Sequence, residues 1–192
     1  MTLGRVLQIV GPLWGLAELV MAFALRGHGR PVRGRDRGSL VLLWVAILIG
    51  LFAGNLLFPV HGPWIPPSPT LITAVGLAIL LAGLALRLTA ILTLRRFFTT
   101  RVTIRRDQPI VQHGVYRRIR HPSYTGLMMA FLGLGLALAA YGSWLSFFAL
   151  LLPILAALLY RISVEERALR EAFGPAYVEY ARRTRRLVPC VW

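Results

Sequence analysis

The stretch that decides how this chain folds is GVYRRIRHPSYTG, residues 114–126. It lies directly before a long apolar run and carries three arginines: Arg117, Arg118 and Arg120. Arginine side chains enter hydrocarbon only at a high free-energy cost, so the segment is predicted to lie at a membrane surface. Pro122 suits the first turn of a helix, where its missing N–H has no partner to lose. His121 is therefore expected at the helix start, beside free backbone donors and the positive end of the helix dipole.

The composition is that of an integral membrane protein. Of the 192 residues, 57% are hydrophobic and only 15% are charged, and the mean hydropathy is +0.66. These values are too apolar for a soluble domain of this length. In a soluble protein the formal net charge of +15 would indicate nucleic acid as a partner, but beside apolar runs it indicates anionic lipid headgroups instead. The single Cys190 excludes an internal disulfide, and the four histidines lack metal-ligand spacing, so no metal is expected.

Five apolar runs are long enough to cross a bilayer. They cover residues 6–25, 39–60, 70–94, 123–140 and 144–160. A cleaved signal peptide is the alternative interpretation of the first run. It is disfavoured because only Arg5 precedes the run and no small-residue cleavage site follows it. Three residues separate the last two runs, which are therefore expected to form a tight antiparallel hairpin.

The polar segments between and after these runs complete the predicted architecture. The connector 95–122 contains a short β-like piece, RVTIR, at 101–105. In the tail, EERALREAF (165–173) has helical spacing, Gly174–Pro175 breaks it, and a second short helix is expected over 176–186.

The fold class is therefore all-α integral membrane, with five transmembrane helices. Residues 1–69 hold two N-terminal helices. Residues 70–192 hold a core of three membrane helices, the polar connector 95–122, and short C-terminal helices within 161–192.

Arginine counts predict the orientation in the membrane. Five, eight and seven arginines lie in the segments 26–38, 95–122 and 161–192. The N-terminal tail holds one, and the loops at 61–69 and 141–143 hold none. The positive-inside rule then places the N-terminus outside and the C-terminus in the cytoplasm. A short chain whose basic residues are all arginine is typical of a prokaryotic inner membrane.

Two polar pieces are expected to converge on the cytoplasmic side. Because the hairpin loop is short, the start of the fourth run and the end of the fifth must be neighbours. His121 and Tyr124 should therefore face Arg161, Glu165 and Glu166 across a small gap. Each residue alone has an ordinary interpretation, Arg161 as an interfacial anchor and the two glutamates as partners of a helix dipole. Their convergence indicates a functional site.

The same residues carry a resemblance to a known family. GVYRRIRHPSYTG, followed after two apolar runs by RISVEERALREAFGPAYVEYARRTRRLVP, resembles the isoprenylcysteine carboxyl methyltransferase family and its relatives among phospholipid methyltransferases. The resemblance covers residues 70–192 and implies S-adenosylmethionine as cofactor. Integral-membrane sterol reductases look similar in this region, so the two motifs predict the fold more specifically than the reaction.

The resemblance also implies which residues form the site. Cofactor contacts of the family map onto Gln108, Pro109, Ile110, Val111, Tyr116, His121, Pro122, Ser123, Tyr124 and Glu165. The substrate-facing arginine of the family maps onto Arg161. Side-chain chemistry agrees, since tyrosine rings can stabilise a sulfonium and Glu165 can pair with an ammonium group. His121 and the helix start can meet a carboxylate.

The expected reaction is an in-line methyl transfer in which the enzyme aligns the reactants and excludes water. A carboxylate acceptor, such as that of a prenylcysteine, would be held by Arg161 and needs no base. An amine acceptor on a phospholipid would need a base, for which Glu165 and Glu166 are candidates. Arg161, Glu165 and Glu166 are thus the candidate catalytic residues. The other hypotheses are another amphiphilic acceptor, a reductase of a flat lipid that uses a nicotinamide cofactor, and a non-enzymatic membrane protein.

Two ionisable residues, Glu18 and Arg87, fall inside the predicted spans. Each lies eight residues from the arginine that ends its run, about 12 Å below the cytoplasmic face. A lone charge at that depth costs about 2–3 kcal/mol. We expect the first and third helices to touch and these side chains to pair as support for the pocket. The alternative is that Arg87 snorkels to the headgroups while Glu18 is protonated.

Overall fold

The computed structural model describes residues 14–16, 18, 20, 36, 38–57, 68–100, 102, 104, 108–140 and 143–187. Over these residues the chain forms helices and no strand. The α-helices are α2 (Ser39–Leu57), α3 (Pro69–Leu94), α4 (Pro122–Ala139), α5 (Trp144–Phe173) and α6 (Pro175–Arg183). Two short 3₁₀ helices, η1 (Arg95–Phe97) and η2 (Gly114–Arg117), lie in the connector between α3 and α4.

Four helices are long and apolar enough to cross a membrane: α2, α3 with η1, α4 and α5. They coincide with four of the five predicted runs. The fifth predicted span, residues 6–25, lies mostly outside the described residues, so the total of five stays a prediction. The β-like piece at 101–105 is described only at Val102 and Ile104, neither of which lies in a strand.

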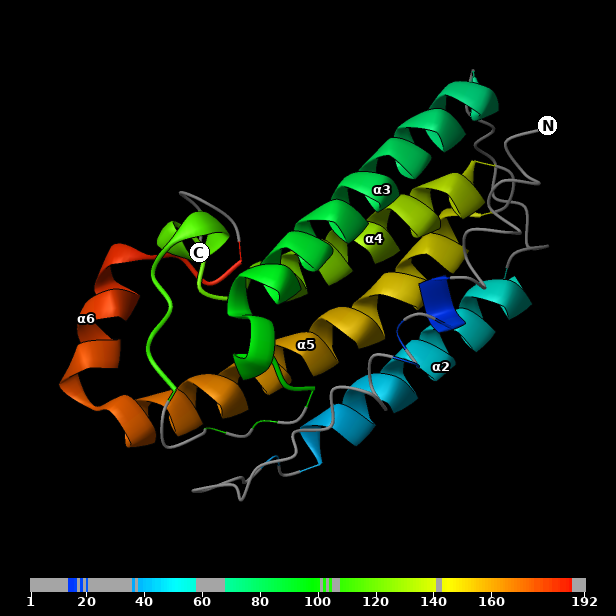
Figure 1. The fold of residues 1–192 in the computed structure, drawn as a ribbon. Coiled ribbons are helices and arrows are strands. Elements are labelled where there is room, and N and C mark those ends of the chain that lie inside the picture. Colours follow the sequence, from blue (N-terminus) through cyan, green and yellow to red (C-terminus); the bar gives the residue numbers. More distant parts are fainter. Residues whose placement is uncertain are drawn as a thin grey trace.

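The membrane helices form two pairs (Figure 1). Helix α3 packs along α4, and α2 packs along α5. Contacts between α4 and α5 join the two pairs, which confirms the predicted hairpin. Ser143 caps the start of α5, because its hydroxyl accepts a 3.0 Å hydrogen bond from the backbone N–H of Leu145.

Glycines bring α3 and α4 into close contact. Gly76 and Gly83 lie two turns apart on α3, opposite Gly133 and Gly126 on α4. A methyl group added at Gly83 would lie 2.6 Å from the carbonyl oxygen of Gly126, and one at Gly76 would lie 2.6 Å from that of Gly133. Such distances leave no room for a Cβ atom. Small residues in this arrangement let helix backbones approach, which is how helices gain packing energy in lipid.

Helix α5 continues beyond the membrane as one element. At 1.5 Å per residue its 30 residues span about 45 Å, against a hydrocarbon core of about 30 Å. The predicted separate helix over 165–173 is therefore wrong, because these residues are the polar end of α5. Glu165 and Glu166 lie within a helix rather than at its start. Gly174, with φ of 55°, ends α5, and Pro175 begins α6, which stops at Arg183 instead of the predicted residue 186.

The segment after α6 docks against the start of α4. Ile119 and Arg185 form a parallel β-bridge. The backbone N–H of Arg120 donates to the carbonyl of Arg185 at 2.7 Å, and that of His121 donates to the carbonyl of Arg186 at 3.1 Å. Backbone hydrogen bonds thus directly join the two motifs through residues that lie 65 positions apart in the sequence.

The predicted pairing of Glu18 with Arg87 is confirmed. Arg87 donates from Nε to Glu18 Oε1 at 2.5 Å and from Nη2 to Oε2 at 2.7 Å, a bidentate ion pair. Trp14, one turn earlier, donates from Nε1 to the same Oε1 at 3.2 Å, and its ring lies 4.7 Å from that of Phe131 on α4. These contacts fix the described part of the first predicted span against α3 and α4, and the snorkelling alternative is wrong.

We predict that Gly83→Ala lowers the stability of the folded protein by about 1–3 kcal/mol, because the new methyl group forces α3 away from α4. Thermal unfolding in detergent measures this. Gly15→Ala is the matched control, since a methyl group there meets nothing within 4 Å. Equal melting temperatures for the two variants would contradict the close packing of α3 on α4.

The Glu18–Arg87 pair predicts strong coupling between two distant positions in the chain. Glu18→Gln or Arg87→Gln alone leaves an uncompensated buried charge and should cost about 3 kcal/mol. The double variant should cost less than the sum of the two by about 1 kcal/mol or more. A double-mutant cycle on thermal unfolding measures the coupling. Strictly additive losses would show that the two side chains do not support each other.

Candidate functional site

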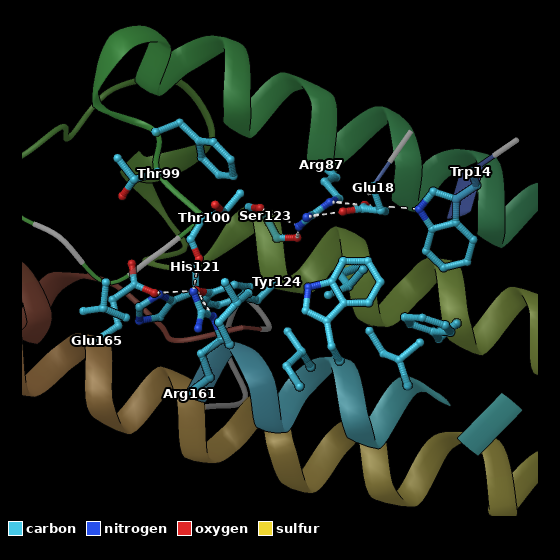
Figure 2. Close-up of a pocket in the computed structure, with 18 of the residues that line it drawn as sticks. Trp14, Glu18, Arg87, Thr99, Thr100, His121, Ser123, Tyr124, Arg161 and Glu165 are labelled. Atoms are coloured by element: carbon cyan, nitrogen blue, oxygen red, sulfur yellow. Dashed lines mark hydrogen bonds and ion pairs between the residues drawn. The ribbon is translucent and has the colours of Figure 1, made fainter. Parts of the chain in front are cut away.

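A cavity of about 590 Å³ lies between the two helix pairs. Both Ser123, in the first turn of α4, and Leu138, near its end, line this cavity, so it runs about 22 Å along the helix. One end is apolar and is lined by leucines of α2 and α4 and by Ile47. The other end is polar, and there side chains from α3, α4, α5 and the connector point toward one another (Figure 2).

Arg161 on α5 is the hub of the polar end. Its side chain is only 3% exposed, and four neighbouring groups hold it. Nε donates to the Tyr124 hydroxyl at 3.0 Å, and Nη2 donates to the carbonyl of Thr100. Nη1 donates to Ser39 Oγ at 2.9 Å and to Asp36 Oδ1 at 3.2 Å. One guanidinium therefore connects the start of α2, the connector and α4 to α5.

Tyr124 links Arg161 to Glu165. Its hydroxyl accepts from Arg161 and donates to Glu165 Oε2 at 2.7 Å. Arg161 and Glu165 lie one turn apart on α5, so the phenol bridges two opposite charges on the same helix face. A substitution of either charged residue therefore removes one hydrogen-bond partner of the Tyr124 hydroxyl.

His121 lies between the two glutamates. Its ring is buried and stacks on Tyr124, with the centroids 5.7 Å apart and the planes 18° apart. Nδ1 lies 4.0 Å from Glu165 Oε2, and Nε2 lies 3.4 Å from Glu166 Oε1. The predicted convergence of His121 and Tyr124 with Arg161, Glu165 and Glu166 is therefore what the structure shows.

Glu166 turns away from the cavity and organises the C-terminal segment. Its carboxylate, 3% exposed, lies 3.0 Å from Arg120 Nε and 3.1 Å from Arg186 Nη2. Arg120 also donates to the backbone carbonyls of Ala181 and Thr184. Glu166 thus anchors the connector and the chain after α6 to α5.

Arg87 fixes the first turn of α4 from the opposite side. Its Nη1 donates to Ser123 Oγ at 2.8 Å and to the Ser123 carbonyl at 3.1 Å, while its other nitrogens hold Glu18. Neighbouring residues of α4, Ser123 and Tyr124, are therefore held by arginines from two different helices.

The charges around the cavity follow a simple pattern. Among the residues that the structure describes, three arginines line the cavity, and each has a carboxylate partner: Arg87 with Glu18, Arg120 with Glu166, and Arg161 with Asp36. In the same set, Glu165 is the one cavity-lining carboxylate that makes no ion pair with an arginine. Its side chain is 30% exposed. The described part of the site therefore places a carboxylate without an arginine partner one turn from a buried arginine.

The structure brings most of the predicted site residues together, but not all. Those that line the cavity are Gln108, Tyr116, His121, Ser123, Tyr124, Arg161 and Glu165. Those that do not line it are Pro109, Ile110, Val111, Pro122 and Glu166. Residues 109–111 follow Gln108 in the connector, and Pro122 opens α4 directly after His121.

Tyr116 lies in η2 at the edge of the polar end. It is buried, and its hydroxyl is 3.5 Å from the carbonyl of Ala90. Burial raises the pKa of Tyr116, with Glu165 adding to the shift, so its hydroxyl stays protonated at neutral pH. The Tyr180 hydroxyl donates to the Tyr116 carbonyl at 2.8 Å and fixes η2 on α6.

Sequence reasoning missed several members of the network: Asp36, Ser39, Thr100 and Arg120. Asp36 had a signal, since it is the lone acidic residue in the arginine-rich loop 26–38. Thr100 acts through its backbone carbonyl, which no side-chain pattern reveals. Within the described part of the chain, no group of three His, Cys, Asp or Glu residues is arranged to hold a metal ion.

Comparison with known proteins adds independent information. The profile of the isoprenylcysteine carboxyl methyltransferase family matches residues 74–171. "Protein-S-isoprenylcysteine O-methyltransferase B" of Arabidopsis thaliana is 39% identical over 118 residues, which cover 60% of this chain and 58% of that protein. A "probable protein-S-isoprenylcysteine O-methyltransferase" of Oryza sativa subsp. indica is 33% identical over 184 residues, 91% of this chain and 90% of the relative.

A solved structure shares the fold. It is that of "the eukaryotic intramembrane Ras methyltransferase ICMT (isoprenylcysteine carboxyl methyltransferase)", with a TM-score of 0.55 and 24% identity. The match covers 83% of this chain and 55% of that one, so this chain spans little more than half the length of several proteins it resembles. The matching profile covers His121, Tyr124, Arg161 and Glu165 of the site, and the rice relative matches over nearly its whole length. The chain belongs to the isoprenylcysteine carboxyl methyltransferase family.

Proposed function

We propose that this protein is a membrane methyltransferase that transfers a methyl group from S-adenosylmethionine to the carboxylate of a lipophilic acceptor. A prenylcysteine-type carboxylate is the acceptor class that fits best. The observation that carries the proposal is the placement of Glu165 and Arg161 on one face of α5, joined through Tyr124, at the polar end of an apolar cavity. The negative charge of Glu165 suits the cationic methyl donor, and the positive charge of Arg161 suits the anionic acceptor.

The polar end fits S-adenosylmethionine by the chemistry of its side chains. When bound, this cofactor supplies an electrophilic methyl group on a sulfonium cation. Glu165 is an anionic partner for a cationic part of the cofactor, since it makes no ion pair with any arginine in the described part of the chain. Tyr124 presents an aromatic ring. His121 and the first turn of α4 supply donors for a carboxylate. Gln108 and Tyr116 complete the lining on the connector side.

The apolar end of the cavity fits a long hydrocarbon chain. The lining there comes from Ile47 and from leucines and aromatic rings of α2 and α4, and these side chains carry no charge. An acceptor whose chain lies along this 22 Å path would place its polar end beside Arg161. Arg161 then orients the acceptor oxygen, and the buried surroundings exclude water.

The site supports a carboxylate acceptor better than an amine. In carboxylate transfer the acceptor oxygen bonds to the methyl carbon as the carbon–sulfur bond breaks, so one negative and one positive charge disappear and no proton moves. Amine transfer needs a base. Glu166, which sequence reasoning named for that role, is held by Arg120 and Arg186 away from the cavity. Glu165 already accepts the hydrogen bond of Tyr124.

The polar end of α5, the connector and α6 lie on one side of the membrane helices (Figure 1), and we place this side in the cytoplasm by its arginine content. Plant proteins are prominent among the relatives. The prokaryotic origin stays a prediction from composition.

The function is tested by incubating the purified protein in lipid with methyl-labelled S-adenosylmethionine and N-acetyl-S-farnesylcysteine. We expect label in the acceptor that mild alkali releases as methanol, because the product is an ester. Phosphatidylethanolamine, offered in parallel, should remain unlabelled. Alkali-stable label in the amine lipid, with none in the farnesylcysteine, would overturn the carboxylate assignment.

The role of Glu165 is tested by binding. Glu165→Gln should weaken binding of S-adenosylhomocysteine, the product form of the cofactor, about tenfold or more, because a hydrogen bond to a charged group contributes about 1.5–3 kcal/mol. Isothermal titration calorimetry measures this. Glu171→Gln, a change of the same charge at an exposed position of α5, should bind like the unmodified protein. Equal affinities for all three proteins would contradict the assignment of Glu165.

A further inference from the structure

We propose that Asp36 competes with the acceptor's carboxylate for Arg161 and so controls how tightly the acceptor binds. Asp36 pairs with the guanidinium when no anionic acceptor is present and loses this partner when one binds. The inference rests on the proposed function, because it takes Arg161 as the acceptor-binding group. It concerns Asp36, a residue that the motifs of the site do not include.

The Asp36–Arg161 pair is the weakest of the three arginine–carboxylate pairs at the cavity. Glu18 holds Arg87 with both oxygens, at 2.5 and 2.7 Å. Glu166 is nearly fully buried and lies between two arginines. Asp36 contacts Arg161 through a single oxygen at 3.2 Å, and its side chain is 23% exposed. Bidentate and buried pairs resist exchange, whereas a monodentate, partly hydrated one gives way to a better-placed carboxylate.

Asp36 has other partners that remain when it loses Arg161. The Ser39 hydroxyl donates to the same Oδ1 at 2.5 Å, and the Ser39 backbone N–H donates to the Asp36 carbonyl at 2.8 Å. Both bonds lie at the first turn of α2, where the helix dipole favours a negative charge. Asp36 therefore keeps a favourable place after the exchange, which lowers the free-energy cost of releasing the arginine.

Arg161 also keeps its position during the exchange. Tyr124 holds Nε and the Thr100 carbonyl holds Nη2, and neither contact involves Asp36. Arg161 lines the cavity while Asp36 does not, so the acceptor reaches the guanidinium from the cavity. The acceptor and Asp36 then compete for its single positive charge, and the acceptor displaces Asp36 from Nη1.

Methyl transfer ends the competition between the acceptor and Asp36 for Arg161. The acceptor carboxylate carries a negative charge and opposes Asp36, whereas the ester product carries none. Asp36 then recovers the whole attraction of Arg161, and the product loses its strongest polar contact. Asp36 thus weakens the binding of the acid and leaves that of the ester unchanged, which favours release of the product.

Asp36→Asn tests this inference, because it removes the charge and keeps the shape and an acceptor oxygen for Ser39. We expect the variant to bind N-acetyl-S-farnesylcysteine about threefold to tenfold more tightly than the unmodified protein, as fits the loss of one partly exposed competitor. Its affinity for the corresponding methyl ester should not change. Equilibrium binding in lipid nanodiscs, with S-adenosylhomocysteine present throughout, measures both values.

The controls separate the possible outcomes. Glu171→Gln removes an exposed charge from the same helix as Arg161 and should leave both affinities unchanged. Asp36→Ser also removes the charge and keeps a side-chain oxygen near Ser39, so it should act like Asp36→Asn, and it serves in its place if that variant unfolds. Unchanged or weaker binding of the acid by folded variants would overturn the inference and mark Asp36 as a simple anchor of Arg161. If the unmodified protein binds neither acid nor ester, the proposed function fails and the inference fails with it.

Discussion

The placement of buried arginine charges is the constraint on which the rest of the structure depends. Arg87, Arg120 and Arg161 line one cavity inside a membrane protein, where an unpaired guanidinium would cost several kcal/mol. Each is balanced by a carboxylate from a distant part of the chain. The three pairs therefore join the N-terminal region and the connector to the membrane helices, and Glu166 also holds Arg186 of the C-terminal segment. Among the described residues that line the cavity, these pairs leave Glu165 as the one carboxylate without an arginine partner.

Helix packing fixes the positions of these charged side chains. Glycines hold α3 against α4 and α2 against α5, and the close backbone approach leaves little freedom for either pair to slide. The two pairs diverge around the cavity, which is apolar along the helices and polar at one end. An amphiphile fits such a space in one orientation only. Orientation of an acceptor beside a methyl donor is most of what methyl transfer requires of a protein.

The sequence predicted those features that depend on local chemistry or on short connections. Apolar runs located four membrane helices, Pro122 located the start of α4, and a three-residue loop required His121 and Arg161 to be neighbours. The depth of Glu18 and Arg87 predicted their pairing. The sequence could not predict that α5 continues through Glu165 and Glu166 as one helix. Nor could it predict that Glu166 faces the C-terminal segment, because the β-bridge between Ile119 and Arg185 is a long-range contact. Asp36 was missed for the same reason, since only the folded chain brings it to Arg161.

The central claim is that Glu165 and Arg161 divide the polar end of the cavity between a cationic donor and an anionic acceptor. An experimental structure with S-adenosylhomocysteine and N-acetyl-S-farnesylcysteine bound together tests it most directly. We predict the ammonium group of the cofactor product at hydrogen-bonding distance from Glu165, the farnesyl chain along α2 and α4, and the acceptor carboxylate on Arg161. A carboxylate bound at another arginine, or a farnesyl chain outside the cavity, would contradict the claim.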